Sequence, residues 1–167
     1  MKKIIVVIAG ILLAGTVQAQ TAEGIKEGSS HVKLLAGSAQ ASLNVGLEYE
    51  RRTGTFGVGG FLLSSTKNED AVKPESLTLG FTATSHLVDR NDLDIYVQPG
   101  VAVTNVDSIT ADGDDDTLVG PTLAIGAVYS ITPKWGVGMQ YLSIYNWFSD
   151  KSVNKYEFAN LVLGYNY

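Results

Sequence analysis

Apolar and polar residues alternate along much of the chain, and residues 42–62 show this most clearly. Leu43, Val45, Leu47 and Tyr49 are apolar, and small or polar residues stand between them. Successive side chains of a β-strand point to opposite faces, so a period of two predicts strands with one apolar face. No long window has the 3.6-residue period of a helix.

The alternation recurs in eight segments, which we read as strands. They are residues 31–37, two strands within 42–62, then 76–87, 93–106, 118–131, 135–148 and 156–167. The connections 51–54, 88–92 and 132–134 are short, whereas 64–75, 107–116 and 149–155 are longer and charged. Short turns at one end and long loops at the other are typical of an outer-membrane barrel.

The composition of the polar face indicates whether that face meets water or lines the inside of the barrel. It carries Ser, Thr, Asn, Gln and many of the 18 glycines, with few charges: Lys33, Glu48, Glu50, Asp94 and Glu157. A face in water would be rich in Lys and Glu, whereas small residues suit the inside of a narrow barrel. We therefore predict an all-β, eight-stranded antiparallel up-and-down transmembrane β-barrel with a packed polar interior. A soluble lipocalin-like barrel is the alternative.

Aromatic residues on the apolar face favour the membrane barrel, because they gather near the strand ends. Tyr and Trp are enriched at bilayer interfaces, although they also occur as ordinary core residues. The predicted belts comprise Tyr49, Phe56, Tyr129, Trp135, Tyr165 and Tyr167 near the short turns or the C-terminus, and Tyr145 and Trp147 near a long loop.

Two prolines conflict with regular strand pairing. Pro99 and Pro121 each lack the N–H that a strand donates to its neighbour. We expect a β-bulge where the fifth and sixth strands meet.

The first residues are interpreted as a secretory signal peptide. Lys2 and Lys3 precede a short apolar run, and small residues up to Ala19 form a cleavage site. We expect the signal peptide to span 1–19, a polar leader to span 20–30 and the barrel to span 31–167. This organisation predicts export to the bacterial outer membrane.

Composition excludes several other classes of protein. The chain has 12 Lys and Arg against 17 Asp and Glu, and two of the basic residues lie in the signal peptide. This acidic balance argues against nucleic-acid binding, which needs a basic surface. Cysteine is absent, so disulfides, a lipid-anchored N-terminus and thiolate chemistry are excluded. Charged residues make up 17% of the chain, below the ~25% usual for soluble domains.

The chain resembles the small eight-stranded outer-membrane barrels typified by the OmpA transmembrane domain and the OmpX/Ail group. The matching residues are the terminal LGYNY and the run ITPKW that opens the seventh strand. Such proteins end in an aromatic residue, commonly Phe, that the outer-membrane assembly machinery reads. The resemblance therefore implies an assembly signal at Gly164, Tyr165 and Tyr167.

Candidate chemistry inside the barrel begins with one histidine. If residues 88–92 form a tight turn centred near residue 90, His86 lies opposite Asp94 and both point into the lumen. A His–Asp pair can orient a base for a serine nucleophile, but it can equally be a buried pair that satisfies its own hydrogen bonds. We favour the second interpretation.

Other inward charges are interpreted as internal contacts. His31 and Lys33 face inward and can pair with Glu48 or Glu50, which would stabilise the fold. An eight-stranded barrel is just wide enough for side chains to fill, so a general porin is not expected.

The acidic run 107–116 suggests calcium. Asp112, Asp114 and Asp116 have the spacing of the first ligands in an EF-hand loop. Thr117 stands where that loop needs Gly, and Leu123 stands where it needs the closing Glu. We expect a solvated loop, with loose binding of divalent cations that bridge to lipopolysaccharide phosphates as the alternative.

These observations predict a non-enzymatic protein that acts in envelope structure or in surface interactions through its extracellular loops. The alternatives are a lipid-modifying enzyme of the outer membrane and a narrow pore for ions or small solutes. Expected partners are outer-membrane lipid, lipopolysaccharide and the assembly machinery, with no cofactor. A monomer is expected, and no motif identifies an extracellular partner.

Overall fold

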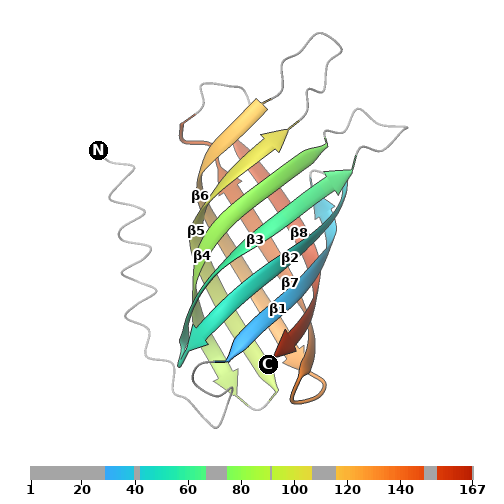
Figure 1. The fold of residues 1–167 in the computed structure, drawn as a ribbon, viewed down its shortest axis with the longest axis vertical. Helices are drawn as coiled ribbons and strands as arrows, with labels where there is room; N and C mark the ends of the chain where they lie inside the picture. The colour runs from blue at the N-terminus through green and yellow to red at the C-terminus, as the bar shows by residue number, and fades with distance from the viewer. Residues whose placement is uncertain are drawn as a thin grey trace.

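The computed structural model describes residues 29–39, 42–66, 75–90, 92–106, 116–148 and 154–166, without the side chain of Asp116. Eight strands form one closed barrel in which each strand pairs with its neighbours in the chain and β8 pairs with β1 (Figure 1). All of these pairings are antiparallel, as predicted. The strands are β1 (Ser30–Ala39), β2 (Ser42–Thr53), β3 (Phe56–Thr66), β4 (Ser76–Arg90), β5 (Leu93–Val106), β6 (Asp116–Ser130), β7 (Trp135–Tyr145) and β8 (Lys155–Asn166).

The two ends of the barrel differ in their connections. Short turns follow β2, β4 and β6 at one end, here called the turn end, where β1 also begins and β8 finishes (Figure 1). The opposite, loop end carries the connections that follow β1, β3, β5 and β7. The turn after β2 has only two residues, and the first, Gly54, has φ 62°, which glycine adopts without steric cost.

Two predicted turns proved too long. Residues 51–54 and 88–92 were assigned to turns, but β2 continues to Thr53 and β4 continues to Arg90. Charged residues near a turn resemble loop residues in a sequence, although here they remain paired within the sheet. Arg52 and Asp89 are therefore strand residues.

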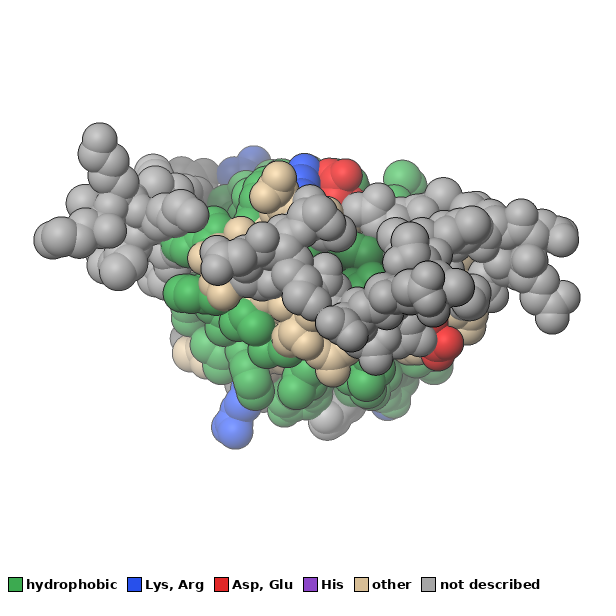
Figure 2. Space-filling model, turned by 90° about the horizontal axis from the view of Figure 1, so that it is seen from above, with side chains coloured by type: hydrophobic (Ala, Val, Ile, Leu, Met, Phe, Trp, Pro, Cys, Tyr) green, Lys and Arg blue, Asp and Glu red, His purple; other side chains and the backbone are tan. Residues whose placement is uncertain are grey.

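The outer wall is apolar, as the alternation predicts. Leu43, Phe81 and Leu161 are each 66% exposed, whereas their sequence neighbours face the interior. Hydrophobic side chains lie around the wall when the barrel is viewed from the loop end (Figure 2). Among the described residues, no helix is long and apolar enough to cross a membrane.

The predicted bulge between β5 and β6 is absent. These strands pair through both Pro99 and Pro121 without any shift in register. The irregularity lies instead between β4 and β5, where the register shifts between His86 and Val88. An extra residue on one strand reverses the alternation beyond it, so Asp89 turns into the interior.

The prolines are tolerated because each adjoins a gap on its other side. Pairing between β4 and β5 is interrupted at 83–84 and 98–99, beside Pro99. Pairing between β6 and β7 begins at Thr122, one residue after Pro121. Proline lacks the N–H that donates to a neighbouring strand, so it destabilises a sheet least where no such hydrogen bond is made.

The interior has two parts, and the prediction of a polar interior is incomplete for one of them, where an apolar cluster lies among buried polar side chains such as Asn44, Thr78 and Asn160. Side chains in the half nearer the turn end are mostly polar or charged. The half nearer the loop end contains a cluster that we call the apolar plug. Its members are Leu35, Ala39, Phe61, Leu63, Ala102, Val106, Leu118, Ala124, Leu142, Ile144, Tyr156, Phe158 and Val162, each at most 5% exposed.

Glycines make room for the largest interior rings. A Cβ atom at Gly80 would lie 2.3 Å from the ring of Phe61, and one at Gly126 would lie 2.3 Å from the ring of Tyr96. Such distances are far inside van der Waals contact. These two positions therefore require glycine because the facing aromatic ring occupies the space of a side chain.

Candidate functional site in the barrel lumen

Glu48 is the centre of the polar half of the lumen. It lies on β2 and is 2% exposed. Lys33 Nζ on β1 and Gln98 Nε2 on β5 donate to its Oε1 at 2.8 and 2.7 Å, and Gln140 Nε2 on β7 donates to Oε2 at 2.8 Å. Gln140 also donates to Gln98 Oε1 at 2.9 Å. One carboxylate thus connects four strands across the barrel.

A second buried carboxylate extends this network. Lys33 Nζ also donates to Glu50 Oε2 at 3.2 Å and lies 4.1 Å from the centre of the Tyr96 ring. Charge-assisted bonds of this kind are stronger than neutral ones, and burial makes an unpaired partner costly. The predicted pairing of Lys33 with Glu48 or Glu50 is present, and it involves both carboxylates at once.

His86 lies between two carboxylates. Its Nε2 atom is 2.8 Å from Glu50 Oε1, and its Nδ1 atom is 2.8 Å from Asp94 Oδ1. The sequence analysis placed His86 opposite Asp94, but the bulge pairs His86 with Tyr96 and Asp94 with Asp89. The contact between His86 and Asp94 therefore runs diagonally across the two strands.

This arrangement limits what His86 can do chemically. Ionised carboxylates only accept hydrogen bonds, so where both partners are ionised, both ring nitrogens donate and the ring is the charged imidazolium. An imidazolium has no lone pair with which to take a proton from a serine nucleophile. In this geometry His86 joins β4 to both β2 and β5.

Sequence reasoning missed a third buried pair. Arg52 Nη2 donates to Asp89 Oδ2 at 2.6 Å, and Arg52 Nε donates to the Gly54 carbonyl at 2.7 Å. Arg52 lies two residues after Glu50 and four after Glu48, so the alternation of the strand predicts that it shares their inward face. No signal pointed to Asp89, because the bulge reverses the face on which it lies.

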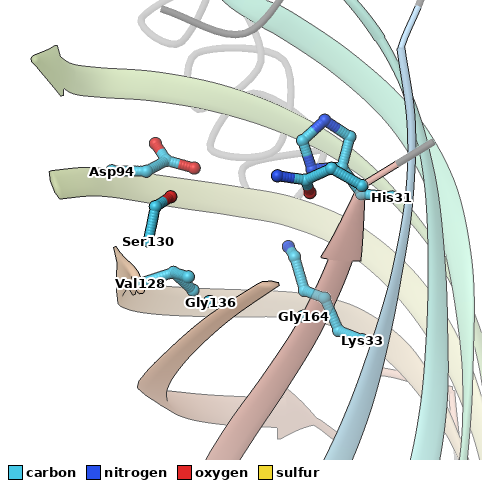
Figure 3. A pocket seen from close by; sticks show the side chains of 8 residues that line it. His31, Lys33, Asp94, Val128, Ser130, Gly136 and Gly164 are labelled. Carbon is cyan, nitrogen blue, oxygen red and sulfur yellow. The ribbon is translucent and has the colours of Figure 1, made fainter. Parts of the chain in front are cut away.

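A small cavity adjoins this network at the turn end. It has a volume of about 20 Å³, which is room for one water molecule. His31 and Lys33 from β1 lie on one side of it, and Asp94 and Ser130 lie on the other (Figure 3). His31 Nε2 is 3.0 Å from Ser29 Oγ, and His31 lies directly opposite Glu50, one of the two predicted glutamates, in the pairing of β1 with β2.

The remaining predicted sites lie elsewhere or outside the described residues. Asp112 and Asp114 are not among the described residues, and the side chain of Asp116 is not described either. Within the described part of the chain, no cluster of His, Asp and Glu has the arrangement of a metal site. Tyr167 of the expected assembly signal also falls outside, whereas Gly164 and Tyr165 lie in β8.

Glu157 was assigned to the inner face, and this was wrong. It lies on the outer wall of β8, where it forms an ion pair with Lys155 and accepts a hydrogen bond from the Tyr141 hydroxyl. Its neighbours Tyr156 and Phe158 are buried in the apolar plug. Period two places Glu157 opposite to those neighbours, so the sequence contained the correct signal.

The sequence matches the outer membrane protein beta-barrel domain family over residues 9–167. The chain belongs to this family. Membership places this outer-membrane β-barrel in the bacterial outer membrane. Short turns of such barrels face the periplasm, so the turn end is called the periplasmic end below and the loop end the extracellular end. A sequence search of curated proteins finds no match.

Solved structures agree with the fold of this outer-membrane β-barrel. The N-terminal barrel domain of Pseudomonas aeruginosa OprF has a TM-score of 0.70 at 14% identity, covering 84% of this chain and 98% of that one. Ail of Yersinia pestis has a TM-score of 0.56 at 16% identity, with coverages of 85% and 100%. Neisserial surface protein A has 0.55 at 15%, with coverages of 83% and 93%.

The described members of the predicted aromatic belts lie on the outer wall of this outer-membrane β-barrel, except Trp147, which follows β7 and belongs to no strand. Tyr49, Phe56, Tyr129, Trp135 and Tyr145 are 38–54% exposed, and Trp147 and Tyr165 are partly exposed. The ring centres of Trp135 and Tyr165, on adjacent strands, are 4.8 Å apart near the periplasmic end. This pair is amphipathic, as residues at a bilayer interface are.

Proposed function

We propose that this outer-membrane β-barrel has a non-enzymatic role, in envelope structure or in surface interaction through its extracellular loops. The observation that carries the proposal is the filling of the lumen. The network around Glu48 occupies the periplasmic half, and the apolar plug occupies the extracellular half. A filled interior leaves the loops as the part best suited to contact other molecules.

Two observations weigh against the alternative of a lipid-modifying enzyme. Both nitrogens of His86 are engaged by carboxylates, so the ring is not available as a base. His86 also lies near the periplasmic end, on the inner side of the wall, and is 1% exposed. A lipid substrate would meet the outer side of the wall or the extracellular rim.

The alternative of a narrow pore is weakened by the apolar plug. An ion that passes through the barrel would have to lose its hydration between side chains such as Phe61, Ile144 and Phe158. Polar side chains share this half of the lumen, and pairs such as Asn44 with Asn160 and Thr78 with Thr104 are hydrogen-bonded to one another. Lipopolysaccharide, outer-membrane lipid and the assembly machinery remain the proposed partners of a monomeric barrel.

The proposal is tested with the full mature chain. Purified protein in planar bilayers should give no stepwise conductance, and it should show no phospholipase or lipid A deacylase activity above that of a His86→Ala variant. Steps of conductance, or activity that disappears in His86→Ala, would contradict the proposal.

A cellular experiment separates the two non-enzymatic roles. A strain that lacks the protein is complemented with the native chain or with a chain whose connections 67–75, 107–115 and 149–154 are shortened. If the role is structural, both chains restore resistance to detergent. If the role is surface interaction, only the native chain restores attachment to surfaces or cells.

A further inference from the structure

The pairing of β1 with β8 is the seam that closes the barrel (Figure 1). It joins the first strand to the last, whereas every other pairing joins strands that follow one another in the chain. The seam runs from His31 opposite Asn166 to Ala39 opposite Phe158. Bringing together residues that are so far apart in the chain costs more loop-closure entropy than forming a hairpin. The seam is therefore the pairing that chain connectivity favours least.

One side-chain hydrogen bond passes over this seam inside the lumen. Asn44 Nδ2 on β2 donates to Asn160 Oδ1 on β8 at 2.7 Å. Both asparagines are paired with Gly37 of β1, which lies between them. Gly37 has no side chain to separate them, so the two amides meet over the backbone of β1. We call this bond the amide bridge, and it requires β8 to lie beside β1.

The two amides of the bridge depend on each other. Asn44 and Asn160 are 1% and 4% exposed. In the described part of the chain, Asn44 Oδ1 and Asn160 Nδ2 have no hydrogen-bond partner, so the bridge is the one bond that each side chain makes. A buried amide that loses its only bond carries a desolvation cost. Opening the seam separates the amides, and no other described group on either strand replaces the lost partner.

Other polar pairs in this half of the lumen join consecutive strands. Thr78 Oγ1 and Thr104 Oγ1 are 2.9 Å apart on β4 and β5, and Ser65 Oγ and Ser76 Oγ are 2.6 Å apart on β3 and β4. Their partners are 26 and 11 residues apart in the chain, against 116 for the amide bridge. These pairs can form within a hairpin before the barrel closes, whereas the amide bridge forms only on closure.

We propose that the amide bridge is a latch that keeps the seam between β1 and β8 closed. An open seam exposes unpaired backbone groups of two strands, which lipid cannot satisfy and which a strand of another protein can pair with. The backbone pairing of the seam resists such opening, and the latch adds a side-chain contact that only the closed barrel makes. This inference goes beyond the proposed function and does not rest on it.

The test measures hydrogen–deuterium exchange of the refolded mature protein in detergent micelles by mass spectrometry. Backbone amides exchange when a region opens locally, so peptides from β1 and β8 report on the seam and peptides from β4 and β5 report on a hairpin. Asn44→Leu and Asn160→Leu each remove the bridge with a side chain of comparable size. The matched control is Thr78→Val, which removes the hydroxyl pair between β4 and β5 and leaves the bridge in place.

We expect each asparagine variant to raise the exchange rate of the seam amides about tenfold, and to change that of β4 and β5 less than about twofold. Thr78→Val should leave the seam amides within about twofold of the native chain. The double variant Asn44→Leu/Asn160→Leu should open the seam no more than either single variant, because both act through one bond.

Three results would overturn the latch. They are unchanged exchange at the seam, an equal rise in all strands, and opening of the seam by Thr78→Val to the same extent. An equal rise would mean that the bridge contributes only to overall stability. Additive effects in the double variant would also overturn it. Folding of each variant is checked by gel migration before and after boiling, and Asn44→Ala and Asn160→Ala replace any leucine variant that does not fold.

Discussion

The guanidinium of Arg52 lies 2.6 Å from the carboxylate of Asp89 inside the periplasmic mouth of the barrel, and their side chains are 1% and 8% exposed. The two residues come from strands that are not adjacent, β2 and β4. Asp89 reaches the lumen only because the bulge in β4 reverses its face. The pair therefore couples the register of β4 to the position of β2.

Replacing Arg52 with Ala leaves Asp89 as a buried charge without its guanidinium partner. We expect the free energy of unfolding, measured by urea titration in lipid vesicles, to fall by about 3–5 kcal/mol. Arg51→Ala, on the outward face next to it, should change the value by no more than about 0.5 kcal/mol. Equal losses in the two variants would show that the buried pair has no special role.

Glu48→Ala should destabilise the barrel more than any exposed carboxylate does. It leaves Lys33 with Glu50 alone and deprives Gln98 and Gln140 of an acceptor, so we expect a loss of about 3–5 kcal/mol. The control Glu157→Ala breaks an exposed ion pair and should cost much less, because exposed pairs are screened by solvent. The same urea titration measures both, and a ranking in the opposite order would contradict the assignment of Glu48 as the centre of the network.

Two glycines of the inner face should respond differently to alanine. At Gly126 the added Cβ would meet the buried ring of Tyr96 at 2.3 Å, whereas at Gly164 the nearest atom is 3.8 Å away. We expect Gly126→Ala to lower the free energy of unfolding by about 1–3 kcal/mol because the interior is overpacked. Gly164→Ala should be tolerated within about 1 kcal/mol. Similar results for both would mean that the ring of Tyr96 moves aside readily.

The apolar plug predicts a contrast between two phenylalanines. Phe158 is fully buried in the plug, and Phe81 is 66% exposed on the outer wall. Phe158→Ala should cost about 3–5 kcal/mol, since truncation leaves a cavity that neighbouring side chains fill only in part. Phe81→Ala should cost much less, because lipid occupies the vacated space. Urea titration in lipid vesicles measures the free energy of unfolding of both variants, and equal losses would argue against a packed plug.

The C-terminal aromatic yields a prediction about assembly rather than stability. Tyr167→Ala should reduce the amount of protein that reaches the outer membrane in its heat-modifiable form, whereas Tyr167→Phe should not. The measurement is the ratio of shifted to unshifted bands in washed outer membranes. Normal assembly of Tyr167→Ala would show that Tyr167 is not part of an assembly signal.

The fold was accessible from sequence because a barrel wall imposes a simple rule on every strand. One side meets lipid and the other meets the lumen, so period two recurs in the strands between residue 43 and residue 163, apart from the bulge in β4. The prediction was weakest at the strand ends and at the prolines. Arg52 and Asp89 resemble turn residues, and Pro99 and Pro121 resemble breaks, because a sequence does not show which neighbouring strand each backbone group faces.

The contacts inside the lumen were harder to predict from the sequence, for two physical reasons. Leu142, Ile144 and Phe158 lie on the inner face of strands whose outer face is also apolar, so alternation does not mark them as a second core. The contacts of Glu48 and His86 join strands across the barrel, and their partners depend on strand tilt and on one bulge. Neither the tilt of the strands nor the position of a bulge can be derived from the period of a single strand.

The sequence by itself determined the number of strands and most of the lipid-facing residues, since these follow from the alternation within each segment. Only the tertiary structure decided which interior side chains meet. Closing the sheet brings residues as distant as Glu48 and Gln140 to 2.8 Å, and a single extra residue in β4 selects Asp89 as the partner of Arg52. Local patterns govern the faces of strands, whereas closure and register govern the contacts between them.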